Sequence, residues 1–167
     1  MIRVSITSNY RVDCSASILA PLPRELVWMR MSDLGRFASL DPFHRHIVLP
    51  EGMRVGSRIL IKHAFLTFRT LRRGRVMKWR DGIGYAFTDL CMRDPRVAFP
   101  HSYEYLLGPH AEGWSAVTIR VRGRWTARFL PRFAVRLWLR WVMMQAAMAV
   151  RNELLDWAIR VRRGEHG

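Results

Sequence analysis

The fold is decided by the stretch Ile18-Leu-Ala-Pro-Leu-Pro-Arg-Glu-Leu-Val-Trp28, in which an extended segment turns into a helix. Upstream of it, residues 10–18 alternate apolar and polar side chains, which is typical of a half-buried strand. The two prolines stop that strand, and Pro23 stands where a helix can begin. The apolar residues that follow recur at helical spacing, at Leu26, Val27 and Met31. The stretch therefore predicts a strand followed at once by a short helix.

A second short helical segment is predicted over residues 33–40, with Asp33 as its N-cap and Asp41-Pro42 as its end. Beyond it, alternation predicts a meander of strands over residues 44–49, 57–68, 70–79, 83–92, 101–107 and 114–125. The turn signals lie at residues 50–52, the 72–74 region, 81–82, 94–100 and 108–113. Asp81-Gly82 is the clearest hairpin turn, because both residues tolerate a positive φ.

After Pro131 the apolar period becomes helical and continues to about Arg162. The stripe that we expect to face the sheet consists of Phe133, Leu137, Trp141, Met144, Met148, Leu155 and Ile159. A helix of this length spans roughly 45 Å and should lie across the whole sheet. Residues 137–150 are apolar almost all round, so further apolar surface must be covered by the first helices, by a second subunit in a symmetric homodimer, or by a membrane. The candidates for that surface are Trp138, Val142, Met143, Ala146 and Ala149.

Composition is consistent with one domain over residues 1–167, since 50% of the 167 residues are apolar. Basic residues outnumber acidic ones 28 to 13, and all of them except Lys62 and Lys78 are arginine. A net charge of +15 reflects arginine-rich codon usage, contact with anionic groups, or both. The two cysteines, Cys14 and Cys91, fit neither a disulfide framework nor a zinc spacing, and we expect buried free thiols. The N-terminus lacks a signal-peptide run, so we expect a cytoplasmic protein with possible peripheral contact to a membrane.

The order of these elements resembles the helix-grip fold of the START-related (SRPBCC) superfamily, over a core of about residues 10–162. The resemblance is carried by the Ala-Pro and Val-Trp of residues 18–28, by Asp33-Leu-Gly-Arg-Phe37 with Leu40-Asp41-Pro42, and by Val55-Gly56-Ser57. It implies an α+β fold, with a curved antiparallel sheet of about six or seven strands around the long C-terminal helix. It also implies an apolar ligand cavity between the two. No Rieske or mononuclear iron motif is recognisable, and we expect no cofactor.

Strand alternation places a group of polar residues inside this expected cavity. His63, Asp89 and Tyr103 are the candidate catalytic residues: an imidazole that titrates near neutrality, a carboxylate that orients it, and a phenol that holds a carbonyl or enol oxygen. The alternative is that each is a polar residue satisfied by a neighbour or by solvent. The candidate ligand-binding residues are Ile61, Phe65, Tyr85, Phe87, His101, Tyr105, Val117, Ile119, Trp141, Met144 and Met148.

A second polar cluster, Asp41-Pro-Phe-His44-Arg-His46, suggests a metal. In a regular strand His44 and His46 share a face, and Asp41 or His101 could add a ligand. Because only two converging ligands can be shown from the sequence, we predict no metal.

The last strand and the start of the long helix are strongly basic. No acidic residue lies between Gly113 and Asn152, while Arg120, Arg122 and Arg124 alternate on the outer face of the strand. Along the helix, arginines four residues apart form a ridge among aromatic side chains, at Arg128, Arg132, Arg136 and Arg140. This pattern suits contact with anionic lipid, and less well with nucleic acid, for which no reading motif is present. The alternative is a solvated face.

Together these features predict a protein that binds a bulky hydrophobic small molecule. The resemblance favours an enzyme of the polyketide cyclase/dehydratase branch, of lyase or isomerase type, that works by acid–base chemistry. A non-catalytic carrier of a lipid, isoprenoid or quinone at a membrane surface is the first alternative, and a ribosome- or RNA-associated member of the superfamily the second. The sequence leaves open whether the protein is an enzyme.

Overall fold

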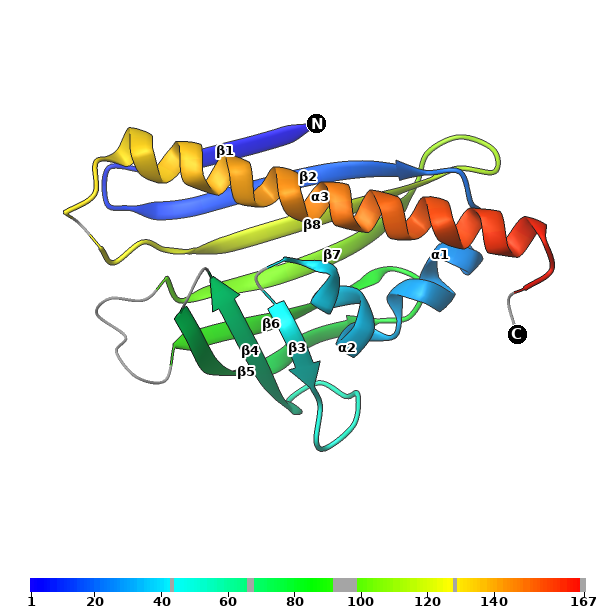
Figure 1. Cartoon of the computed structure of the whole chain (residues 1–167), viewed down its shortest axis with the longest axis horizontal. Helices are drawn as coiled ribbons and strands as arrows, with labels where there is room; N and C mark the ends of the chain where they lie inside the picture. Colours follow the sequence, from blue (N-terminus) through cyan, green and yellow to red (C-terminus); the bar gives the residue numbers. More distant parts are fainter. Residues whose placement is uncertain (43, 66–67, 92–98, 128, 166–167) are drawn as a thin grey trace.

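The computed structural model describes residues 1–42, 44–65, 68–91, 99–127 and 129–165, without the side chains of Ala64, Phe65, Phe68 and Cys91. It is an α+β structure in which one curved antiparallel sheet is covered by helices on one face (Figure 1). Along the chain the strands and helices are β1 (Ile2–Ile6), β2 (Arg11–Ala20), α1 (Arg24–Met31), α2 (Leu34–Phe37), η1 (Ala38–Leu40), β3 (His44–Val48), β4 (Arg58–Phe65), β5 (Phe68–Arg80), β6 (Gly84–Cys91), β7 (His101–Pro109), β8 (Ser115–Arg124) and α3 (Arg132–Arg162). The predicted fold class is confirmed.

The sheet has eight strands in the order β1-β2-β8-β7-β6-β5-β4-β3, which is more than the six or seven predicted. The additional strand is β1, which pairs antiparallel with β2 from Ile2 opposite Ala16 to Ile6 opposite Val12. Its own alternation of isoleucine and valine with polar residues is short but sufficient to form this edge strand.

The stretch that decides the fold behaves as predicted. Strand β2 ends at Ala20, Pro23 is the N-cap of α1, and the Asp33 carboxylate caps α2 by accepting a hydrogen bond from the Arg36 amide at 3.1 Å. Between β5 and β6, Gly82 adopts a φ of +65°, as the predicted Asp81-Gly82 turn requires.

The turn signal in the 72–74 region is wrong, because these residues lie inside β5. Gly74 does not form a turn there but lets β5 approach β6 closely. A Cβ at this position would lie 1.8 Å from the carbonyl oxygen of Thr88 on β6, so only glycine permits this close approach of the two strands. Arg72 therefore lies in the sheet rather than in a loop.

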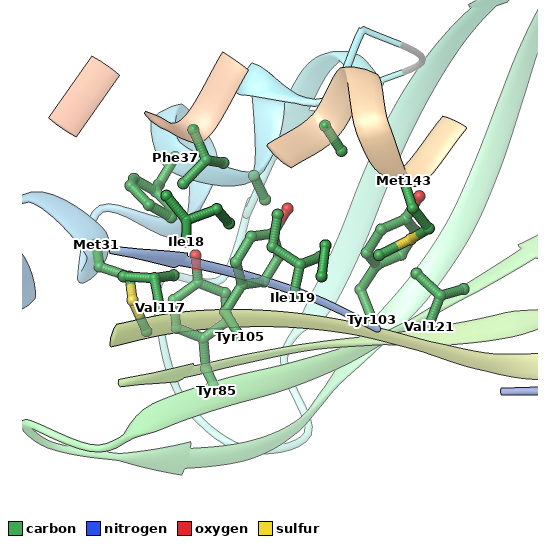
Figure 2. Packing of buried hydrophobic residues seen from close by; sticks show 14 of the residues in the cluster. Ile18, Met31, Phe37, Tyr85, Tyr103, Tyr105, Val117, Ile119, Val121 and Met143 are labelled. Atoms are coloured by element: carbon green, nitrogen blue, oxygen red, sulfur yellow. The ribbon is translucent and has the colours of Figure 1, made fainter. Parts of the chain in front are cut away.

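The core fills the space between the concave face of the sheet and the helices. Figure 2 shows Tyr85, Tyr103 and Tyr105 packed with Ile119, Val121 and Met143. Cys14 belongs to this core as a buried free thiol, and desolvation, with a smaller effect of Asp13, raises its pKa to about 12. The Cys91 side chain lies outside the described residues.

The long helix lies along one half of the sheet, where it contacts mainly β2 and β1, rather than across all of it (Figure 1). Its sheet-facing stripe is also not the predicted one. The buried residues are Val135, Leu139, Val142, Met143, Ala146, Val150, Leu154, Trp157 and Ala158. In the predicted stripe, Leu155 is half-buried and the other residues are exposed, at Phe133, Leu137, Trp141, Met144, Met148 and Ile159.

This assignment of faces is testable by truncation. We expect Leu154→Ala, at a fully buried position, to lower the free energy of unfolding by about 2–5 kcal/mol, because it removes contacts and leaves a cavity. Leu137→Ala, at a position that is 64% exposed in the same helix, should change it by less than about 0.5 kcal/mol. Urea denaturation of both variants measures the difference, and a larger loss for Leu137→Ala would contradict the observed packing of α3.

Candidate functional site

A cavity of about 250 Å³ lies between α3 and the concave face of the sheet. Its walls differ in chemistry. The apolar wall consists of Phe99, Val121, Trp138, Leu139, Val142 and Met143. The other wall carries His63, Thr70, Arg72, His101 and Tyr103. A cavity of this kind suits a hydrophobic molecule that carries polar atoms at one end.

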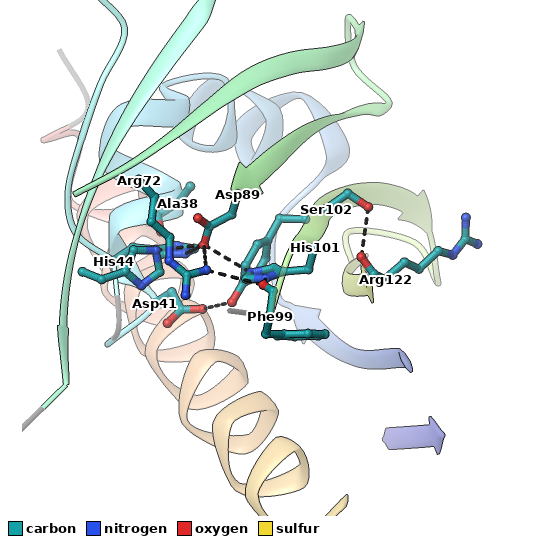
Figure 3. A network of polar contacts seen from close by, with 11 residues as sticks. Ala38, Asp41, His44, Arg72, Asp89, Phe99, His101, Ser102 and Arg122 are labelled. Carbon is teal, nitrogen blue, oxygen red and sulfur yellow. Dashed lines mark hydrogen bonds and ion pairs between the residues drawn. The ribbon is translucent and has the colours of Figure 1, made fainter. Parts of the chain in front are cut away.

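Five adjacent strands each contribute one polar side chain to a cluster at the polar wall. They are His44 on β3, His63 on β4, Arg72 on β5, Asp89 on β6 and His101 on β7. The strand register brings them together, since His44 lies opposite His63 and Asp89 lies opposite His101. Figure 3 shows four of these residues converging, with the Asp89 carboxylate between the others.

One oxygen of Asp89, Oδ2, is the point on which the cluster converges. It lies 2.8 Å from Nε2 of His63, 3.2 Å from Nε2 of His101 and 3.6 Å from Nε2 of His44. The Arg72 guanidinium adds a contact from Nη1 at 3.3 Å. The Asp89 side chain is fully buried, whereas those of His63 and Arg72 are 14% and 16% exposed. The cluster therefore presents His63 and Arg72 to the cavity and keeps the carboxylate behind them.

Backbone and side-chain contacts hold the cluster from behind. The Nδ1 atoms of His44 and His101 lie within hydrogen-bond distance of the carbonyl oxygens of Ala38 and Phe99. The Tyr103 hydroxyl donates a hydrogen bond to Oδ2 of Asp41 at 2.9 Å, and both residues are buried. Since Nδ1 of His44 and of His101 meets a carbonyl, the Nε2 atoms are fixed toward Asp89.

Burial and neighbouring charges shift the pKa values of Asp89, His63 and His44. Burial alone would raise the pKa of the Asp89 carboxyl, but the contacts with His101, His44 and His63 outweigh it and hold this pKa well below its ordinary value. Desolvation lowers the pKa of His63, and the nearby His44 and Arg72 lower it further. Together they outweigh Asp89, which acts to raise this pKa. For His44, desolvation is outweighed by Asp41 and Asp89, so its pKa is raised. At neutral pH, His63 is therefore a neutral base beside an ionised carboxylate.

The same cluster brings three metal-ligating residues together, where sequence analysis found two. Ligand atoms of His44, Asp89 and His101 lie within 4.8 Å of one another. However, Arg72 already places a guanidinium at the oxygen that a metal ion would need. The Asp89 carboxylate thus already faces a guanidinium and three imidazoles, so the donor set fits an ion-pair network better than a divalent cation. The absence of a metal stays a prediction.

The predicted pairing of His44 with His46 is wrong. A register shift between these two residues, in which His44 pairs with His63 and His46 with Lys62, turns their side chains to different environments. His44 is fully buried, and His46 is exposed. A bulge of this kind inverts the face that a strand residue occupies.

The structure places the other predicted site residues in several different environments. Among the candidate catalytic residues, His63 and Tyr103 line the cavity, and Asp89 contacts His63 from behind. Of the described ligand-binding candidates only His101 lines the cavity, while the remaining strand residues are core residues outside its lining, namely Ile61, Tyr85, Phe87, Tyr105, Val117 and Ile119. Trp141, Met144 and Met148 are exposed on α3 outside the cavity lining, and Phe65 and Arg128 lie outside the described side chains.

Sequence reasoning missed Arg72, and it assigned Asp41 and His44 to a different kind of site. The turn signal at residues 72–74 concealed Arg72, although inward alternation with Thr70 would have revealed it in a continuous strand. Phe99 follows a segment without strand alternation, and no sequence signal placed it in the cavity wall. The apolar wall of α3 was missed because the helix has apolar residues on both faces.

No family model and no curated protein matches this chain. Solved structures do match, and together they show that the protein has the helix-grip fold of START-related proteins. The aromatase/cyclase Zhui from Streptomyces sp. R1128 is 15% identical, with a TM-score of 0.69 over 94% of this chain and 99% of that one.

Two further neighbours have the same fold. The di-domain ARO/CYC StfQ from the steffimycin biosynthetic pathway is 14% identical, with a TM-score of 0.70 over 93% of this chain, which spans 53% of that protein. Ara h 8.0201 is 13% identical, with a TM-score of 0.65 over 87% of this chain and 99% of that one.

The opposite pKa shifts of His44 and His63 can be measured directly. We expect His44 to titrate above the ordinary 6.5 and His63 below it, because the two rings differ in the carboxylates that they face. NMR of the imidazole C–H signals gives the two midpoints, and the variants His46→Gln and His110→Gln remove the signals of two exposed histidines. A reversed order of the midpoints would contradict the charge distribution described above.

Proposed function

We propose that the cavity binds a bulky hydrophobic molecule that carries a carbonyl group, and that the protein catalyses proton transfer on it, as a polyketide cyclase or dehydratase would. The observation that carries the proposal is the contact of His63 with Asp89 at 2.8 Å, at the wall of an otherwise apolar cavity. Two of the solved neighbours are aromatase/cyclases by name, which supports the same class of reaction.

The chemistry follows from the arrangement of the groups. His63 faces Asp89 through Nε2, so Nδ1 is the nitrogen left to accept a proton from an acidic carbon next to a carbonyl. The electron pair of that C–H bond moves to the carbonyl oxygen and forms an enolate. Asp89 stabilises the imidazolium that results, and the Arg72 guanidinium supplies positive charge and N–H donors at the same wall. The enolate can then attack a second carbonyl, whose oxygen takes the proton back from His63, or expel a β-hydroxyl group, which leaves as water with that proton.

Tyr103 has a narrower role in this proposal than the sequence suggested. Its hydroxyl is engaged by Asp41, and burial together with Asp41 raises the pKa of Tyr103 well above its ordinary value. A phenol that stays protonated and bonded in this way is suited to shape the wall of the cavity rather than to donate a proton.

Filling the cavity tests ligand binding. We expect Val121→Trp to abolish the fluorescence enhancement of the aromatic sulfonate 8-anilinonaphthalene-1-sulfonate, because the indole occupies the space between sheet and helix. Leu137→Trp, on the exposed face of α3, is the control and should retain the enhancement. If Val121→Trp does not fold, Val142→Phe fills the cavity from the helix side. Unchanged binding in a folded filled variant would overturn the cavity as the ligand site.

The base is tested with an enolisable aromatic β-diketone such as 1-phenyl-1,3-butanedione in D₂O. We expect the wild type to accelerate exchange of the protons between the two carbonyls, and His63→Gln to lose about 10²–10⁴-fold of that rate while diketone binding persists. As pH falls, the wild-type rate should drop only below pH 6.5, because the pKa of His63 is lowered. His110→Gln is the matched control. Equal rates for His63→Gln and wild type would overturn the assignment of the base.

A second candidate function is a carrier of a lipid, isoprenoid or quinone, in which the same cavity binds without turnover. The exposed apolar face of α3 favours it, because a carrier must meet the membrane that holds its cargo. Wild-type protein that binds the diketone without accelerating exchange, together with a lipid found by native mass spectrometry after purification from the host, would select the carrier over the enzyme.

A further inference from the structure

The side of α3 that faces away from the sheet carries a continuous apolar stripe. We call it the outer face of α3 and define it by Phe133, Leu137, Trp141, Met144 and Met148, together with the arginines Arg132, Arg136 and Arg140. The apolar side chains are 69%, 64%, 45%, 40% and 52% exposed, in that order. They extend over about 22 Å of helix. A contiguous apolar strip on this scale marks a surface that meets another apolar phase.

Further exposed apolar residues extend the stripe onto the sheet edge beside it. A groove of about 470 Å³ runs between α3 and the first two strands, with Met144 and Met148 on its helix side. Across from them, Met1, Leu19 and Trp114 are 79%, 45% and 44% exposed. The apolar surface is therefore broader than one helix.

The charge on this surface has one sign. Arg132, Arg136 and Arg140 stand four residues apart, and all three are exposed. The Arg132 guanidinium lies over the Tyr10 ring, 5.9 Å from its centroid. The sequence has no carboxylate between Gly113 and Asn152. Within the described part of the chain, no carboxylate forms an ion pair with any of these three arginines. The outer face thus combines exposed apolar side chains with positive charge that the protein itself does not neutralise.

Packing keeps α3 from leaving the sheet. The helix is long and apolar enough to cross a membrane by length and hydropathy, a property that core helices share. Its inner stripe is nonetheless buried against β2 and β1 and closes the cavity through Leu139 and Met143. A helix held in this way can lie on a bilayer surface with one face, as interfacial helices do.

We propose that the outer face of α3 docks on an anionic lipid bilayer, with the apolar stripe at the headgroup boundary and the arginines on lipid phosphates. This surface is separate from the cavity, so the proposal holds for the enzyme and for the carrier alike. A symmetric homodimer through the same face fits less well. In such an interface the patch meets its own copy, so arginine rows would face arginine rows without a carboxylate between them.

Sedimentation with vesicles tests the docking. We expect wild-type protein to bind vesicles of equal parts phosphatidylcholine and phosphatidylglycerol, and to bind pure phosphatidylcholine far less. The double variant Arg136→Glu/Arg140→Glu should lower the partition coefficient on anionic vesicles by about thirtyfold or more, since each arginine near the surface contributes about fivefold. The matched control is Arg45→Glu/Arg69→Glu, at exposed positions on β3 and β5, which changes the net charge equally and should bind as wild type when only the outer face docks.

A second pair of variants separates the apolar contribution. Leu137→Asn should weaken binding to the anionic vesicles, whereas Met77→Asn, 53% exposed on β5, should not. Circular dichroism of each variant checks that it folds, and Arg136→Gln/Arg140→Gln replaces the charge reversal if that variant does not. Equal losses in the outer-face and control variants would overturn the proposal. So would a lipid-free dimer that Leu137→Asn dissociates, or binding to an RNA oligonucleotide without binding to anionic vesicles.

Discussion

The buried carboxylate of Asp89 is the constraint on which the cavity end of the molecule depends. An ionised carboxylate without solvent is costly unless several donors or cations face it, and here three imidazoles and one guanidinium do. Because these groups come from β3, β4, β5 and β7, the carboxylate links five neighbouring strands at one level of the sheet. Against the opposing effect of burial, the contacts with the three imidazoles hold the pKa of Asp89 low. His63, Arg72 and His101 are its partners that line the cavity. One carboxylate oxygen thus contacts side chains from four other strands.

Part of this cluster could be predicted from the sequence, because strand alternation is local. His63, Asp89, His101 and Tyr103 lie on regular stretches of β4, β6 and β7, and counting by two places each on the concave face. The partners that were missed or wrongly paired depend on non-local features. His44 departs from His46 at a register shift that only the pairing with β4 reveals. Arg72 stands two residues before Gly74, a glycine that permits the close approach of Thr88. Neither the register shift in β3 nor the close approach of β5 to β6 can be recognised from the sequence alone.

The orientation of α3 could not be predicted for a different reason. Between Leu137 and Val150 the helix offers two apolar stripes, and periodicity alone cannot choose between them. The choice is made by what lies opposite. The inward residues of β2 include Cys14, Ala16 and Ala20, which are small enough for a helix to approach, and the arginine row excludes the neighbouring side of α3 from the interior. Charge, rather than apolar content, was the informative signal in this segment.

The two apolar faces of α3 meet different surroundings, although residues of the two faces are neighbours in the sequence. Leu137 and Trp141 lie outside, while Trp138 and Val142 line the cavity. A helix of this kind needs apolar residues almost all round, and its solubility then depends on charge placed along one edge. The arginines of the protein also differ in what they contact. The arginines that pair with carboxylates outside the cavity are Arg30, Arg58, Arg120, Arg122 and Arg160. Arg72 belongs to the cavity, and Arg136 and Arg140 on α3 are exposed. Ion pairs therefore balance only part of the net charge of +15, and the exposed Arg136 and Arg140 add to the remainder along the helix that closes the cavity.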